Sequence, residues 1–226
     1  MTRHLLRDLE QMKKEILTVG AMVESVIDKA ITALLSRRQD LAEEVVRGDD
    51  LIDQKEVQVE TDCLKLMALH QPVAGDLRFL IAVLKVNNDL ERMGDHAVNI
   101  AERAMWLSTK EPIQAFLDFP RMADTVRTMV RDSLDSLVGS DTTLARRVCQ
   151  RDAEVDRWNR QAIDELQALM MRDSEAVPRA LQTLSVTRNL ERIADLATNI
   201  AEDVIFMVEG DIVRHRLLRP VPKGGT

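Results

Sequence analysis

The chain has 226 residues, 45% of them apolar and 31% charged, so it can bury a sizeable core and is not intrinsically disordered. Aromatic residues make up only 3% and Tyr is absent, which favours packed helices over a β-sandwich. The net charge is −7. The segment 214–226 has four basic residues and no acidic one, so the rest of the chain carries a charge of −11. This negative charge repels phosphates and argues against nucleic-acid binding.

Three long helices are predicted in the first half. Apolar residues at spacings of three and four run through residues 5–34, which is the stripe of an amphipathic helix. A second helical pattern covers about 41–69, and Pro72 and Gly75 are expected to end it. The third pattern begins near Leu77 and continues beyond Met105.

A linker is predicted where this periodicity stops, from Ser108 to Pro120. Pro120 suits the first residue of a fourth helix, because its missing N–H has no partner there in any case, and this helix should end near Gly139. Ser140 or Asp141 can then cap a fifth helix.

The fifth predicted helix ends near Arg172, and Ser174 can cap a sixth. Pro178 is tolerated only in the first turn of that helix, and Gly210 should end it. No segment shows a strand pattern.

Six long helices with short connections predict an all-α protein of two tandem, pseudo-repeated antiparallel three-helix bundles. The bundles should cover residues 1–110 and 111–213. The basic tail, 214–226, is expected to be an unstructured end, with weak contact to anionic lipid or an acidic partner as the alternative. No run of about 18 apolar residues and no signal-peptide core is present, so a cytoplasmic location is expected. Cys63 and Cys149 form no CxxC pair and are expected to be buried free thiols.

One segment occurs twice. LERMGDHAVNIAE at residues 90–102 returns as LERIADLATNIAE at 190–202, with nine of thirteen positions identical. Helix packing would account for the repeated apolar residues but not for the polar ones, which in the first copy include Glu91, Asp95, Asn99 and Glu102. A polar face retained in both copies indicates a function.

Each half combines an acidic pair on its second helix with another on its third. Residues four apart share a helix face, so neighbouring helices would gather four carboxylates in each bundle. These are Asp49, Asp53, Glu91 and Asp95 in the first half and Asp152, Asp156, Glu191 and Asp195 in the second. Such clusters need protonation, arginines such as Arg92 and Arg192, or a bound cation. Recurrence in both halves favours metal binding, and an ion-pair network is the alternative.

The ligands would all be oxygen atoms, which suits Mg²⁺, Mn²⁺, Ca²⁺ or Fe³⁺ without excluding Zn²⁺, and bridging carboxylates could hold more than one ion. Glu56 and Glu60 extend the first site, whereas Asn159 and Ile163 stand at the corresponding positions of the second, which should hold fewer anions. His96 has no histidine counterpart in the second copy, so we expect it to pack at an interface. No nucleophilic triad or Gly-rich phosphate loop is found.

These two units, each with D-x-x-x-D on its second helix and LER-x-x-D-x-A-x-NIAE on its third, resemble the PhoU family of phosphate-signalling regulators over residues 4–210. The DLR at 76–78 also matches the family pattern. The resemblance implies a cytoplasmic, often dimeric non-enzyme that restrains phosphate-starvation signalling at the inner membrane. Its expected partners are the ATPase subunit of a phosphate ABC transporter and a sensor histidine kinase. The resemblance further implies metal clusters on the eight carboxylates named above. The second copy departs from the family pattern because Arg172 stands where a turn proline is expected.

Two alternatives belong to other classes. One is a metal-free helical scaffold that acts only through interactions. The other is a carboxylate-bridged metal oxidase, which is disfavoured because ferritin-like enzymes use Glu-x-x-His pairs that these acidic motifs lack.

Overall fold

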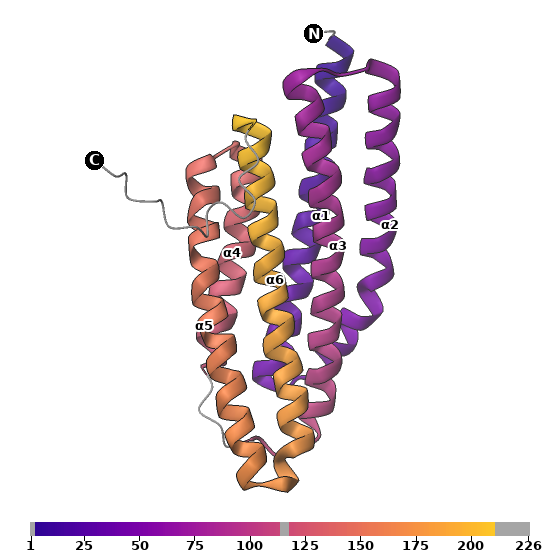
Figure 1. The fold of residues 1–226 in the computed structure, drawn as a ribbon. Helices are drawn as coiled ribbons and strands as arrows, with labels where there is room; N and C mark the ends of the chain where they lie inside the picture. Colours follow the sequence, from indigo (N-terminus) through magenta and orange to yellow (C-terminus); the bar gives the residue numbers. More distant parts are fainter. Residues whose placement is uncertain (1–2, 114–117, 211–226) are drawn as a thin grey trace, which may run out of the picture.

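The computed structural model describes residues 3–113 and 118–210 (Figure 1). Within these ranges the chain forms six long α-helices and one short 3₁₀ turn, with no strand, which confirms the predicted all-α class. The predicted basic tail lies outside the described residues. The elements are α1 (Arg3–Ser36), α2 (Gln39–His70), α3 (Ala74–Ser108), α4 (Phe119–Gly139), α5 (Thr142–Arg172), η1 (Ser174–Ala176) and α6 (Val177–Glu209).

Each half is an antiparallel three-helix bundle, and the two bundles lie side by side (Figure 1). Helices α3 and α6 make the most extensive contact in the molecule and join the bundles along its middle. Helices α1 and α2 flank α3, while α4 and α5 flank α6. One hydrophobic cluster contains residues from all six long helices, so the two bundles share a continuous core.

The turn between α2 and α3 forms at the predicted place. Gln71 adopts a left-handed conformation (φ 45°, ψ 56°) at the end of α2, and Pro72 follows it. Helix α3 begins at Ala74, three residues before Leu77, so Gly75 lies in its first turn and is not a breaker. The apolar pattern alone misses the first turn of α3 because Ala74 and Gly75 are exposed and Asp76 is polar.

The helix starts of the second half depend on aspartates. Asp118 accepts a hydrogen bond from the backbone N–H of Arg121, so α4 begins at Phe119, one residue before the predicted Pro120. Asp141, one of the two predicted caps, accepts from two backbone N–H groups at the start of α5. Ser140 instead ends α4 in a left-handed conformation.

The predicted cap of the sixth helix is wrong. Asp173, not Ser174, accepts the hydrogen bonds of the backbone N–H groups of Glu175 and Ala176 and so caps the 3₁₀ turn η1. Helix α6 follows at Val177 and carries its proline in the first turn, as expected. A carboxylate placed just before the turn reaches these N–H groups, which is the usual chemistry of a helix start.

Among the polar contacts that cross between the bundles in the described residues, two join side chains of α3 and α6. The Nδ1 atom of His96 on α3 lies 2.9 Å from Oδ1 of Asn189 on α6, which confirms the interfacial position predicted for this histidine. Further along, Nζ of Lys85 lies 2.6 Å from Oδ1 of the buried Asp203. Both contacts fix how α3 lies against α6.

Candidate metal centres

The first acidic cluster lies where α2 runs antiparallel to α3. Asp49 interacts electrostatically with Asp53 on its own helix and with Asp95 on α3. Glu91 in turn interacts with Asp95, Asp53 and Glu56. The structure therefore brings together the four carboxylates that the sequence predicted for this site.

The second cluster repeats the arrangement where α5 runs antiparallel to α6. Asp152 interacts electrostatically with Asp195, Asp156 and Glu191. Glu191 interacts with Asp195 and Asp156. These four predicted carboxylates are also brought together.

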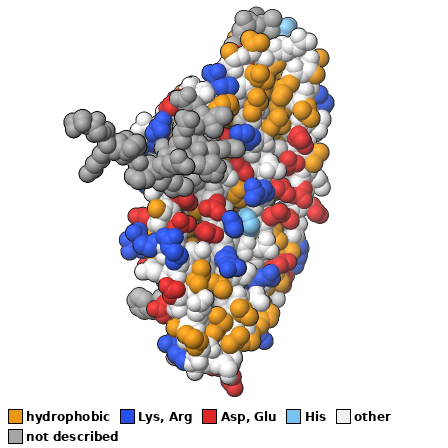
Figure 2. All heavy atoms as spheres, in the orientation of Figure 1, with side chains coloured by type: hydrophobic (Ala, Val, Ile, Leu, Met, Phe, Trp, Pro, Cys, Tyr) orange, Lys and Arg blue, Asp and Glu red, His pale blue; other side chains and the backbone are white. Residues whose placement is uncertain are grey.

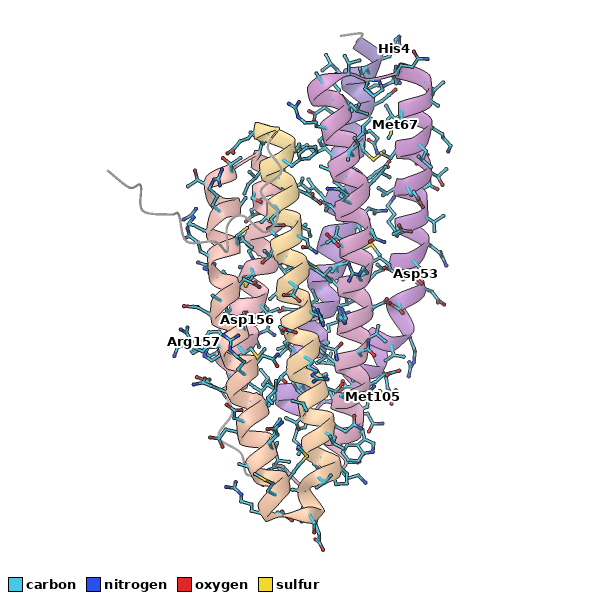
Figure 3. The ribbon with its side chains drawn as sticks, viewed as in Figure 1. His4, Asp53, Met67, Met105, Asp156 and Arg157 are labelled. Atoms are coloured by element: carbon cyan, nitrogen blue, oxygen red, sulfur yellow. The ribbon has the colours of Figure 1, made fainter. Side chains whose placement is uncertain are left out.

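The two clusters lie on opposite sides of the central helix pair. Figure 3 places Asp53 on α2 and Asp156 on α5, with α3 and α6 between them. On the face shown in Figure 2, acidic side chains gather across the middle and apolar side chains toward both ends. The clusters are therefore two separate sites, each between an outer and a central helix.

Burial and mutual repulsion disfavour the charged form of the first cluster. Burial, followed by the charges of Asp53 and Asp95, raises the pKa of Asp49. The pKa of Glu91 is raised by burial and then by Asp95 and Asp53, and the pKa of Glu56 is raised for the same kind of reason. A bound cation would relieve both effects.

The second cluster is more enclosed. All four of its carboxylates are half-buried, whereas Asp53 and Asp95 of the first cluster are exposed. Burial, together with Asp195 and Asp156, raises the pKa of Asp152 to about 6. The pKa values of Glu191 and Asp195 are also raised, chiefly by burial.

Within the described residues, arginines form ion pairs with the second cluster, whereas at the first cluster the charge of Arg92 acts on Glu91 without an ion pair. Arg192 lies 3.3 Å from an Asp195 oxygen and 4.0 Å from a Glu191 oxygen, and Arg160 lies 3.7 Å from Asp156. Half-exposed pairs of this kind contribute little, roughly 0–1 kcal/mol each.

The first cluster differs. Arg92, predicted as its counter-ion, pairs instead with Asp89 at 3.4 Å. Within residues 3–113 and 118–210, no ion pair reaches the first cluster's Asp49, Asp53, Glu91 or Asp95. The ion-pair alternative is therefore weakest at this cluster.

Buried neutral oxygens add to both clusters. Asn87, one turn before Glu91, donates through Nδ2 to the backbone and side-chain oxygens of Glu56, while its buried Oδ1 has no partner in the described part of the chain. In the second cluster the same holds for Oδ1 of Asn159. The Thr198 hydroxyl lies near Asp152 and slightly lowers its pKa, but it makes no hydrogen bond of normal geometry within the described ranges. The sequence analysis overlooked Asn87 and Thr198, although their helical spacing from Glu91 and Asp195 could have indicated them.

The donor atoms suit a cation, but they are not assembled around one. Across the described ranges, no group of three His, Cys, Asp or Glu side chains is arranged to hold a metal ion. Mutual repulsion separates carboxylates that carry like charges, and changing the rotamer of an exposed Asp or Glu costs little. The oxygen atoms of these residues are therefore suitable metal ligands, but the carboxylate side chains must rotate toward one another before they can bind a common ion.

None of the helices in residues 3–113 and 118–210 has a stretch long and apolar enough to span a lipid bilayer.

Comparison with known proteins relates both halves to one family. The PhoU domain matches twice, at residues 16–104 and 119–204, once in each bundle. The chain is 41% identical to the phosphate-specific transport system accessory protein PhoU homolog of Aquifex aeolicus, over 95% of this chain and 97% of that protein.

Two crystal structures share the fold. PhoU from Pseudomonas aeruginosa superposes with a TM-score of 0.88 at 37% identity, covering 91% of this chain and 99% of the other. The phosphate transport system regulatory protein PhoU from Streptococcus pneumoniae gives a TM-score of 0.86 at 31% identity, covering 92% and 99%.

Proposed function

The chain belongs to the PhoU family, and from that premise we propose that it is a negative regulator of phosphate uptake and of phosphate-starvation signalling. The relative from A. aeolicus is named an accessory protein of phosphate-specific transport, and the similarity covers nearly the whole of both chains. The S. pneumoniae structure is named a regulatory protein of phosphate transport. Such names support a regulator and not an enzyme.

In this proposal the protein is an adaptor between the ATPase subunit of a phosphate transporter and a sensor histidine kinase. Its exposed apolar side chains support two contact regions. Leu69 and Val73, 78% and 73% exposed, lie at the α2–α3 turn, and Met171, 85% exposed, lies at the α5–α6 turn. These turns are at opposite ends of the molecule (Figure 1), so two partners could be contacted without competing.

The regulator would depend on metal. In the first site Asp49 and Asp53 on α2 and Glu91 and Asp95 on α3 would hold the ion, and the corresponding acidic pairs of α5 and α6 would hold another. A bound cation would supply positive charge that neutralises the clustered carboxylates. The carboxylates themselves come from two helices at each site, so their shared ion would fix the outer helix against the central one and set the shape of the outer surface.

One observation carries the metal-dependent form of the proposal. The first cluster holds four carboxylates with no ion pair in the described ranges, and the pKa values of Asp49 and Glu91 are raised. Repulsion between these carboxylates destabilises a protein that binds no metal, so a metal-free scaffold gives no reason for the acidic motif to occur in both halves. The scaffold remains the second candidate because Arg192 and Arg160 partly compensate the second cluster.

The regulatory function is tested by deleting the gene and measuring alkaline phosphatase activity in high phosphate. Loss of a negative regulator should release this starvation enzyme from repression, and the wild-type gene on a plasmid should restore repression. Unchanged activity in the deletion strain would refute the regulatory function.

A further inference from the structure

We propose that the first bundle binds a second copy of the chain through the outer face of α2, with the two α2 helices antiparallel about a twofold axis. This self-association goes beyond the regulatory function proposed above and requires no metal. Helix α2 is the outer helix of its bundle, and within the described residues it packs only against α1 and α3 (Figure 1). Its remaining face is therefore open to another molecule.

An apolar hollow lies on this face between α1 and α2. Its volume is about 610 Å³, and its apolar lining includes Met22 and Val26 of α1 and Val45 and Ile52 of α2. Gly48 also lines the hollow, and a Cβ atom at this position would meet no atom within 4 Å outside the backbone of its own helix. A glycine in the middle of a helix lowers stability relative to alanine. The space that this glycine leaves is available to a side chain from another molecule.

Four residues of α2 form a stripe along the same face. They are Glu44, Gly48, Leu51 and Lys55, at spacings of four, three and four, which place them on one side of the helix. Leu51 is 60% exposed, and it lies one turn from the open space at Gly48. Glu44 pairs with Lys29 of α1 at 2.5 Å, yet its side chain is still 57% exposed. The stripe therefore has a projecting leucine beside an open glycine, with opposite charges at its two ends.

This stripe is complementary to itself. When two copies of α2 lie antiparallel with the twofold axis between Gly48 and Leu51, the leucine of each copy meets the glycine of the other. The same axis places Glu44 of each copy opposite Lys55 of the other, and Lys55 forms no ion pair among the described residues. Every contact then occurs twice, as an interface between two identical surfaces requires. The order of these four residues thus favours a second copy over an unrelated partner.

The second bundle has charged residues at the corresponding place. The acidic pair of α2 precedes that of α5 by 103 residues, so Gly48 and Leu51 correspond to Arg151 and Glu154. Arg151 pairs with Asp132 of α4 at 2.7 Å, which places a long charged side chain where α2 has a glycine. The two bundles share a fold but differ on this face, so α2 and not α5 should form the contact.

Sedimentation velocity of the full chain over a range of concentrations measures the association. The wild type should approach twice the monomer mass of 25.6 kDa as the concentration rises. Gly48→Arg and Leu51→Glu copy the residues of the second bundle, and each should raise the dissociation constant of the dimer by at least about tenfold. Circular dichroism should show unchanged helix content, because neither change removes a buried side chain. The matched control is Val57→Glu, an exposed position of α2 outside the stripe, which should associate like the wild type.

Charge reversal tests the antiparallel pairing. Glu44→Lys and Lys55→Glu should each weaken the dimer, because like charges then meet across the axis, and the double variant should restore it. A double variant that associates no better than the single ones would overturn this pairing. A dimer that Gly48→Arg and Leu51→Glu leave intact would place the interface elsewhere and overturn the proposal. A wild type that stays monomeric at every concentration would also overturn it and leave this face to a different protein.

Discussion

His96 on α3 and Asn189 on α6 join the two halves by a hydrogen bond of 2.9 Å between Nδ1 and Oδ1. Asn189 donates its Nδ2 to the backbone oxygen of Ser185, so its Oδ1 is the acceptor and His96 carries a proton on Nδ1. His96 follows Asp95 of the first acidic cluster, and Asn189 stands two residues before Glu191 of the second. One hydrogen bond therefore lies between the two candidate sites.

Removing this bond should weaken the joint between the bundles. In a double-mutant cycle of His96→Ala and Asn189→Ala, we expect a coupling free energy of roughly 1 kcal/mol, because each single change leaves a partly buried polar group without its partner. Urea unfolding followed by circular dichroism measures it. His4→Ala, an exposed histidine near the chain start, should change the free energy of unfolding by less than about 0.5 kcal/mol. Additive effects in the cycle would show that the bond contributes nothing.

Replacing Glu91 and Asp95 with Ala should remove the metal of the first site. We expect elemental analysis of protein purified without chelator to show a loss equal to the content of one site, with the helical circular dichroism signal preserved. A matched control is the double change Asp40→Ala and Glu44→Ala, two acids four residues apart on α2 that pair with basic residues elsewhere.

The control pair should leave the metal content unchanged. If the Glu91 and Asp95 variant became more stable with no change in metal, relief of repulsion would explain the result and the metal site would be refuted.

The acidic clusters were predictable from the sequence because helical spacing and the repeat fix which positions face each other. Asp152 and Asp195, for example, interact across two helices that short connections force to be antiparallel. The pairing of Arg92 with Asp89 was not predictable, because a long arginine side chain can reach carboxylates one turn before it or one turn after it on the same helix. Nor was the shared core, since the wide apolar faces of α3 and α6 do not reveal whether they meet each other or a partner.

Asp152 should make the metal-free protein less stable as the pH rises from about 4 to 6. Its pKa is about 6 in the folded chain and has an ordinary value of 3.8, so the folded state holds the proton more tightly over this window. Its destabilising contribution is absent below pH 4 and complete above pH 6. Allowing for screening by solvent, we expect a difference of about 1 kcal/mol.

Comparison with Asp152→Asn isolates this effect, because other carboxylates titrate in the same range. Urea unfolding in chelator at pH 4, 5, 6 and 7 should show the variant gaining stability relative to wild type as the pH rises. A constant difference across these pH values would contradict the raised pKa.

Bound metal should stabilise the folded chain, because the acidic pairs of α2 with α3, and of α5 with α6, are brought together only when the bundles form. A ligand at 100 times its Kd that binds only the folded state adds about 2.7 kcal/mol. For a chain of this length each kcal/mol corresponds to roughly 2–4 °C in the unfolding midpoint, so chelator should lower that midpoint by several degrees. The matched control is a variant with Glu91, Asp95, Glu191 and Asp195 all changed to Ala, whose midpoint should not respond to chelator. An equal response of the two proteins would place the bound metal outside these acidic clusters, because only the wild type retains all eight carboxylates that the structure brings together.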